Sequence, residues 1–151
     1  MKLDKKDVLL YAVTDFHDLK GKTLSQSVEE AILGGATMIQ LREKQLDQEA
    51  LKEEALIIKE ICQKYQIPFI INDDVQLCQQ LDLDGVHIGQ DDLSLKEARR
   101  ILGEDKIIGV SAHNVEEAKL AYENGASYLG VGAMFTTQTK TNVVQTSLKT
   151  L

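Results

Sequence analysis

Three cations in the sequence stand after apolar runs that read as strands, where they could bind a phosphate group. Arg42 and Lys44 follow the run Met38–Leu41, and Lys140 lies in the threonine-rich stretch that follows Tyr128–Val131. A guanidinium offers paired N–H donors to a phosphate, and an ammonium offers a compact charge. We interpret the three cations as ligands of a phosphate or diphosphate; the alternative is that they are solvated surface charges.

Two carboxylates follow consecutive strands and could bind a divalent cation. Asp73 comes after the run Pro68–Ile71, and Asp92 comes after Gly85–Ile88. Two carboxylates, together with diphosphate oxygens and water, are a common way to hold Mg²⁺. Asp74 and Asp91 are the neighbouring alternatives, and one aspartate of each pair could instead cap the following helix.

Other catalytic patterns are missing from the sequence. Gly130-Val131-Gly132 lacks the rest of a dinucleotide-binding fingerprint, and no phosphate-binding P-loop is present. The histidines His17, His87 and His113 do not have the spacing of a metal-binding helix. His87 alternates with apolar neighbours, which places it inside a barrel wall. Ser111 and His113 are too close in sequence to form a catalytic triad, so we interpret Ser111 as a hydrogen-bond donor to substrate.

Six short apolar runs must position these side chains. They are continuous rather than alternating with polar residues, as is typical of parallel strands covered on both faces. The runs are Val8–Val13, Met38–Leu41, Pro68–Ile71, Gly85–Ile88, Ile107–Val110 and Tyr128–Val131. An open sheet binds its ligand at one switch point, whereas a barrel gathers polar residues from many strand ends. Because nearly every run ends in a polar cluster, we predict an α/β fold of the TIM (βα)8 barrel type.

Helical patterns with clear boundaries separate the runs. Their predicted start signals are Thr23 with Gln26, Asp47, Ser94 with Glu97, and Asn114 with Glu117. Gly35 and Gly125 stand where a helix should end and the chain should turn into the next strand. The sequence around each glycine is similar, so we predict a succession of βα units.

Composition limits the protein to one domain and excludes several classes of partner. The chain has 151 residues, of which 43% are hydrophobic and 27% are charged, and its net charge is −7. Such an acidic chain is not expected to bind nucleic acid or an anionic membrane. Cys62 and Cys78 match no disulfide or zinc pattern, and we predict that both are buried in a reducing compartment. With no membrane-spanning run or signal peptide, the sequence predicts a cytoplasmic protein.

The strand-end motifs, taken together, resemble the thiamine-phosphate synthase family. The matching segments are Gln40–Lys44, Asn72–Asp74, Gly85–Asp92, Gly109–His113 and Tyr128–Gly132, in the family's order along the whole chain. The resemblance implies a TIM barrel and a transferase of thiamine biosynthesis. That transferase joins hydroxymethylpyrimidine diphosphate to hydroxyethylthiazole phosphate, and gives thiamine phosphate and diphosphate with Mg²⁺ as cofactor. The partners implied are therefore these two small molecules.

The resemblance also implies roles for individual residues. Positions that hold the pyrimidine diphosphate are matched by Gln40, Leu41, Arg42, Glu43, Lys44, Asn72, Ser111 and Lys140. Asp73 and Asp92 match the magnesium ligands. The loop that meets the thiazole phosphate is matched by Thr137, Gln138 and Thr139. Arg42, Lys44 and Lys140 would neutralise the leaving diphosphate, so the implied catalysis is electrostatic and needs no covalent intermediate.

The sequence departs from the family after Phe135, where the family continues through further βα units. We therefore expect residues 1–151 to form a single, incomplete barrel domain with about six βα units. Its open edges would invite association into homo-oligomers, and the chain alone would be a poor enzyme. Two alternatives stay open: an inactive or weakly binding fragment, and the paralogous thiazole tautomerase. Retention of Arg42, Asp73, Asp92 and Lys140 argues against the tautomerase.

Overall fold

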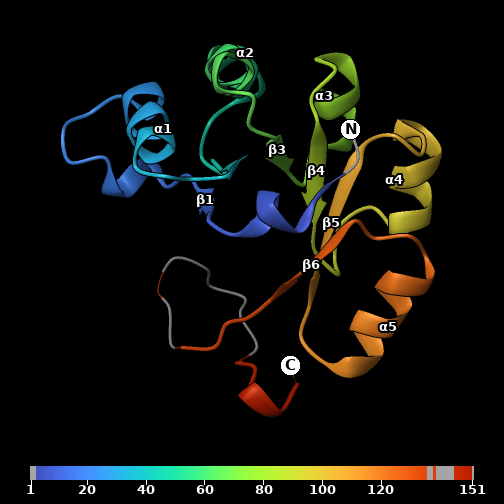
Figure 1. Cartoon of the computed structure of the whole chain (residues 1–151). Helices are drawn as coiled ribbons and strands as arrows, with labels where there is room; N and C mark the ends of the chain where they lie inside the picture. Colours follow the sequence, from blue (N-terminus) through green and yellow to red (C-terminus); the bar gives the residue numbers. More distant parts are fainter. Residues whose placement is uncertain (1–2, 136–137, 139–144, 151) are drawn as a thin grey trace.

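Six parallel strands form one sheet in the computed structural model, which describes residues 3–135, 138 and 145–150. The strands are β1 (Tyr11–Val13), β2 (Met38–Leu41), β3 (Phe69–Asn72), β4 (Gly85–Ile88), β5 (Ile107–Ala112) and β6 (Tyr128–Val131). They are hydrogen-bonded in chain order, each to the next. This order of strands and the curl of the sheet confirm the predicted TIM-type barrel fold (Figure 1).

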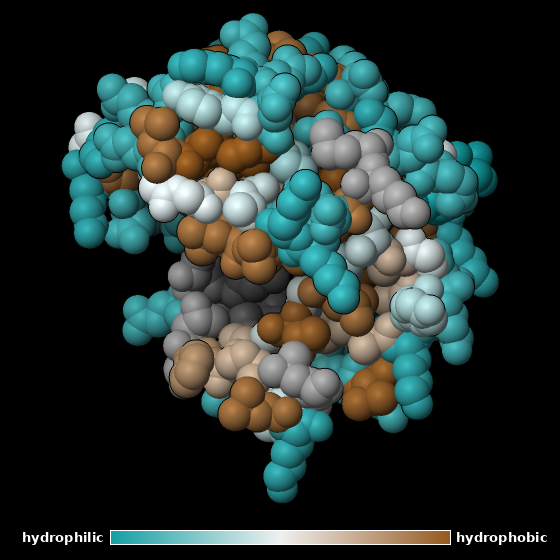
Figure 2. Space-filling model, viewed as in Figure 1, coloured by the Kyte–Doolittle hydropathy of each residue, from teal (hydrophilic) through white to brown (hydrophobic). Residues whose placement is uncertain are grey.

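Among the described residues, five α-helices connect the strands and lie along the outside of the curled sheet (Figure 1). They are α1 (Leu24–Leu33), α2 (Gln48–Tyr65), α3 (Val75–Gln80), α4 (Leu95–Leu102) and α5 (Val115–Glu123). Short 3₁₀ helices are formed by Lys5–Val8, Phe16–Asp18 and Leu148–Thr150. Figure 2 shows hydrophilic residues over the outer helices and hydrophobic residues gathered between them around a hollow.

Alternate residues of each strand face the helices or the inside of the sheet. On β2, Ile39 and Leu41 belong to the main hydrophobic core, which the helices cover. Met38, two residues before Gln40, belongs instead to a small inner cluster with Ile70 of β3 and Ile107 of β5. A strand that is buried on both faces must be apolar at consecutive positions, which explains the continuous runs.

Helix starts follow the predicted signals. Thr23 and Gln26 form a reciprocal capping box at α1, and Asp47, Ser94 and Asn114 each accept a backbone N–H at the start of α2, α4 and α5. After α1 and α5 the chain turns through Gly35 and Gly125, whose φ angles are +108° and +84°. These left-handed conformations favour glycine, which explains why both helices end there.

The first predicted strand, Val8–Val13, is wrong in its first half. Lys5–Val8 forms a 3₁₀ helix, because Asp4 and Asp7 make a capping box that holds the backbone in a helical turn. Strand pairing begins only at Tyr11, which stands opposite Met38. At the other end of the sheet, β5 runs two residues beyond the prediction, because Ser111 and Ala112 pair with β6.

The helices bury one side only. On α2 the buried residues are Ala55, Ile58 and Cys62, one turn apart along a single stripe. Cys62 and Cys78 are both buried and unbonded, as predicted. Over the described ranges, no helix has the length and apolar composition needed to cross a membrane.

The two outer strands of the sheet each have one partner. Within the part of the chain that the structure describes, β1 pairs with β2 and β6 pairs with β5. The side chains of Tyr11 and Tyr128 nevertheless meet across the inside of the sheet, with their hydroxyl oxygens 2.7 Å apart. That the open edges lead to homo-oligomers stays a prediction.

Candidate active site at the carboxyl ends of the strands

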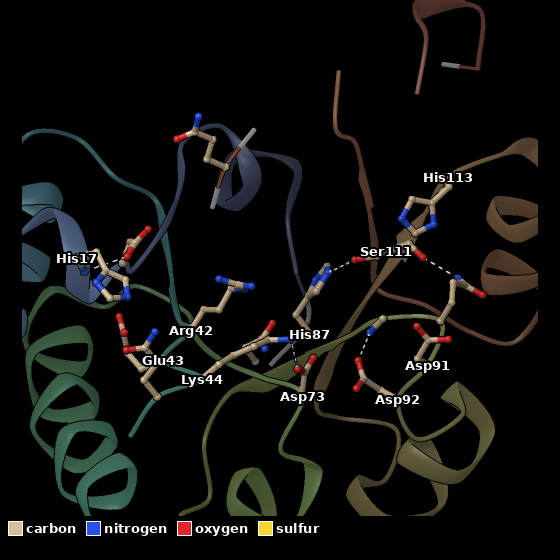
Figure 3. Close-up of a pocket in the computed structure, with 16 residues that line it drawn as sticks. His17, Arg42, Glu43, Lys44, Asp73, His87, Asp91, Asp92, Ser111 and His113 are labelled. Atoms are coloured by element: carbon tan, nitrogen blue, oxygen red, sulfur yellow. Dashed lines mark hydrogen bonds and ion pairs between the residues drawn. The ribbon is translucent and has the colours of Figure 1, made fainter. Parts of the chain in front are cut away.

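A pocket of about 720 Å³ opens at the carboxyl ends of the strands. Because all six strands are parallel, the loops that follow them meet at this one end. The lining residues are Asp15, His17, Arg42, Glu43, Lys44, Gln45, Asn72, Asp73, His87, Gly89, Gln90, Asp91, Asp92, Ser111, His113 and Gln138. Figure 3 shows these side chains converging from separate strands and loops. Such a strongly polar lining suits a charged ligand.

Two of the three predicted phosphate ligands lie in this pocket. Arg42 follows β2, and its backbone N–H donates to Oγ1 of Thr14 at 2.9 Å. The Nε atom of Arg42 is buried and has no hydrogen-bond partner among the described residues. A buried donor without an acceptor is costly, so this guanidinium is suited to an anion that enters the pocket. Lys44 stands nearby, with Nζ 3.4 Å from Oδ2 of Asp73.

The two predicted metal ligands face the same space from β3 and β4. Asp92 Oδ2 accepts the backbone N–H of Gly89 at 2.6 Å. Burial raises the pKa of Asp73, the neighbouring Asp92 carboxylate raises it further, and Lys44 opposes both effects. The structure therefore brings two mutually repelling carboxylates together beside a lysine. Within the described ranges no group of three potential metal ligands occurs, so a cation here would need further oxygens from water or a bound diphosphate.

The neighbouring aspartates have different surroundings. Asp74 caps α3, because its Oδ1 accepts the backbone N–H of Leu77 at 2.8 Å. Asp91 lines the pocket beside Asp92. Of the alternatives left open by the sequence, Asp74 is thus the helix cap that follows Asp73.

Ser111 has a partner that its position in the sequence does not reveal. Its Oγ lies 2.8 Å from Nε2 of His87, which projects from the adjacent strand β4 (Figure 3). His87 is buried and faces the inside of the sheet, as predicted. His113 instead pairs with Glu117, whose Oε2 accepts its backbone N–H at 2.7 Å. Burial opposes ionisation of Glu117, but these contacts with His113 hold the pKa of its carboxyl below the usual range.

The mouth of the pocket includes residues for which the sequence predicted no role in the site. Asp15 and His17 enter through the 3₁₀ helix Phe16–Asp18. This turn is tied to β2, because the backbone N–H of Phe16 donates to Oε2 of Glu43 at 3.2 Å. Burial raises the pKa of Glu43 above its usual range. A hydrophilic turn after β1 was the only available signal for these residues.

Not every predicted ligand reaches the pocket. Asn72 and Gln138 line it, whereas the side chain of Leu41 is fully buried in the core beneath the helices. Gln40 is also buried, and its Nε2 donates to the hydroxyl of Tyr11 at 2.7 Å. Lys140, Thr137 and Thr139 lie outside the described residues.

The family model for thiamine monophosphate synthase matches residues 10–151. The chain belongs to this family. It is 52% identical over 145 residues to the thiamine-phosphate synthase of Clostridium acetobutylicum, an alignment that covers 96% of this chain and 69% of that protein. It is 44% identical over 149 residues to the corresponding synthase of Persephonella marina, across 99% of this chain and 71% of that protein.

A solved structure agrees with the fold described here. The thiamine phosphate pyrophosphorylase of Pyrococcus furiosus superimposes with a TM-score of 0.80 at 35% sequence identity. The match covers 89% of this chain and 64% of that chain. The chain therefore spans about two thirds of the length of these relatives.

Proposed function

We propose that this chain carries out the reaction named for its family, as a thiamine-phosphate synthase. It would transfer the pyrimidine methylene of hydroxymethylpyrimidine diphosphate to the nitrogen of hydroxyethylthiazole phosphate, and release diphosphate. The observation that carries this proposal is the meeting of Arg42, Lys44, Asp73 and Asp92 in one pocket. Two cations beside two carboxylates suit a diphosphate that arrives with a divalent metal.

The leaving diphosphate would lie against Arg42 and Lys44. The buried, unpartnered Nε of Arg42 offers a donor that an anion would satisfy. The side chain of Lys44 is 60% exposed, and its ammonium could turn from Asp73 toward a phosphate oxygen. Both groups would stabilise negative charge as it develops on the leaving group, which is electrostatic catalysis.

Asp73 and Asp92 would hold Mg²⁺. When bound, this ion supplies charge neutralisation to the diphosphate. Several features support the assignment. Burial and the neighbouring Asp92 carboxylate raise the pKa of Asp73, and a bound cation would offset both effects. Asp92 is held in place by Gly89, so little reorganisation would be needed to receive a cation.

Asn72 and Ser111 would orient the pyrimidine diphosphate from β3 and β5, since both line the same pocket as the cations and the carboxylates. Gln138 lies in the segment proposed to meet the thiazole phosphate. No step in this scheme needs a side chain to attack the substrate. Ser111 therefore acts through its hydrogen bonds rather than as a nucleophile.

A coupled assay with both substrates tests the proposal. With Mg²⁺ we expect thiamine phosphate and diphosphate in equal amounts, with none when either substrate is omitted and a large loss when metal is chelated. Calorimetric titration with the pyrimidine diphosphate tests the diphosphate pocket separately. Failure to form product or to bind the pyrimidine diphosphate would contradict the proposal. Isomerisation of a thiazole without condensation would indicate the tautomerase instead.

A further inference from the structure

A continuous row of hydrogen bonds crosses the inside of the sheet from β2 to β5. Gln40 Nε2 donates to the hydroxyl of Tyr11 at 2.7 Å, and that hydroxyl lies 2.7 Å from the hydroxyl of Tyr128. The Tyr128 hydroxyl lies 3.0 Å from His87 Nδ1. His87 Nε2 then meets Ser111 Oγ at 2.8 Å (Figure 3). These side chains thus link five strands of the sheet, namely β1, β2, β4, β5 and β6.

Two glycines make room for this row. A Cβ atom on Gly109 of β5 would lie 2.0 Å from Cζ of Tyr128, so no larger residue fits beside that ring. A Cβ atom on Gly130 of β6 would lie 3.0 Å from Cε1 of His87. The rings of Tyr11 and Tyr128 meet edge to face, with centroids 5.6 Å apart. The side chains of the row therefore have little freedom to adopt other positions.

The amide donor at the start of the row allows one consistent direction for all of its hydrogen bonds. Each phenol has one hydrogen, so Tyr11, which accepts from Gln40, can donate to Tyr128, and Tyr128 can donate to His87. A neutral imidazole in this arrangement would accept at Nδ1 and carry its own hydrogen on Nε2. Nε2 would then donate to Ser111 Oγ, and the hydroxyl hydrogen of Ser111 would be left to point into the pocket.

The two phenols also make His87 a poor general base for activating Ser111 as a nucleophile. Burial raises the pKa of Tyr11 to about 12 and raises that of Tyr128 as well. Both phenols therefore stay neutral near pH 7. In a serine hydrolase, by contrast, a carboxylate beside the imidazole stabilises the cation that forms when the serine is deprotonated. With a neutral phenol rather than a carboxylate at Nδ1, the pair of His87 and Ser111 is better suited to donating a hydrogen bond than to nucleophilic attack.

We propose that Tyr128 is a positioning residue that fixes the tautomer of His87 and thereby makes Ser111 a hydrogen-bond donor to the bound pyrimidine diphosphate. The part that concerns substrate rests on the proposed function; the part that concerns the tautomer does not. Tyr128 itself does not line the pocket. Its effect on substrate must therefore pass through His87 and Ser111.

The test is Tyr128→Phe in the full chain, with Tyr122→Phe as the matched control, since Tyr122 is 80% exposed on α5. Two-dimensional ¹⁵N NMR of the histidine rings at pH 8 reports the tautomer without any substrate. We expect the Nε2–H form of His87 in the unmodified protein and in Tyr122→Phe, and a mixture of tautomers in Tyr128→Phe. Tyr11→Phe should keep the Nε2–H form, because Tyr128 can still donate to Nδ1.

Binding measurements complete the test. Loss of one hydrogen bond should weaken binding of the pyrimidine diphosphate roughly fivefold in Tyr128→Phe. The same change should have no effect when Ser111→Ala is already present. Additive losses, an unchanged His87 tautomer in Tyr128→Phe, or the Nδ1–H form in the unmodified protein would each overturn the positioning role. A tautomer shift in a protein that neither binds nor converts the pyrimidine diphosphate would instead support the hydrogen-bond row and reject the proposed function.

Discussion

The backbone N–H of Asp73 donates to the backbone oxygen of His87 at 2.8 Å, which ties the end of β3 to the end of β4. Asp73 takes a left-handed conformation at this point, with a φ angle of +62°. A non-glycine residue adopts this conformation at some energetic cost, which the surrounding structure must offset. The main chain therefore holds the Asp73 carboxylate beside Asp92.

Replacing either carboxylate should abolish metal use without unfolding the protein. We expect Asp73→Asn and Asp92→Asn to lower turnover roughly a hundredfold or more, because the charge on the leaving group would lose its main counterion. Asp73→Asn should also melt at a slightly higher temperature without Mg²⁺, since it removes the repulsion from Asp92. Turnover against Mg²⁺ concentration and thermal melts measure both effects. Asp91→Asn, in the same pocket, is the control, and equal losses there would contradict the assignment.

Arg42 should be sensitive to shape as well as charge. Arg42→Lys keeps the positive charge and loses the planar set of donors, including the buried Nε. We expect the KM for the pyrimidine diphosphate to rise about tenfold, while the KM for the thiazole phosphate changes little. The control is Arg100→Lys on α4, where the guanidinium is exposed and pairs with Glu97. Equal changes in both KM values would mean that Arg42 has a structural role.

Gly109 should tolerate no side chain while Tyr128 occupies the space above it. Gly109→Ala places a methyl group within the van der Waals radius of that ring, so we expect a loss of about 1–3 kcal/mol in the free energy of unfolding. Urea unfolding measures the loss. Combining Gly109→Ala with Tyr128→Leu removes the clash and should recover part of the stability. If the single variant is as stable as the unmodified protein, the inside of the sheet is less closely packed than described.

Local sequence patterns predicted the part of the site that directly follows the strands. Arg42, Lys44, Asp73 and Asp92 follow strands that are recognisable from their apolar runs, and parallel strands bring such residues to one end. The link from His87 to Ser111 was missed, because it depends on the register of β4 against β5. In that register His87 stands opposite Gly109, two residues before Ser111. No pattern within one segment contains this information.

The sequence motif also did not show which of its side chains pack against the helices instead of entering the pocket. Leu41 lies between Gln40 and Arg42 in a motif that resembles a binding segment, yet its side chain belongs to the core. Strand alternation places Gln40 and Arg42 on the inner face and Leu41 on the outer one. The resemblance to the family assigned a binding role to every residue of the motif. Only the alternation of the strand shows that Gln40 and Arg42 face inward and that Leu41 faces the helices.

The last prediction concerns stability at alkaline pH and rests on the two buried thiols. Burial raises the pKa of Cys62 and of Cys78 from an ordinary value near 9 to about 12. Below pH 9 both the folded and unfolded states keep these protons, so the full stability is present. Between about pH 9 and pH 12 the unfolded chain loses protons that the folded chain retains, and stability must fall as the pH rises. The slope approaches about 1.4 kcal/mol per pH unit for each thiol.

Urea unfolding between pH 8 and pH 10, under reducing conditions, measures this slope. The phenols of Tyr11 and Tyr128, whose pKa values are raised by burial from an ordinary value of 10, contribute equally to the two proteins compared. The unmodified protein is compared with the double variant Cys62→Ala, Cys78→Ala. Its absolute stability should be lower, because each change leaves space in the core. Its decline with pH should nevertheless be shallower than that of the unmodified protein, since two of the titrating groups are gone. Equal slopes in the two proteins would show that the thiols ionise as readily in the folded state as in the unfolded one.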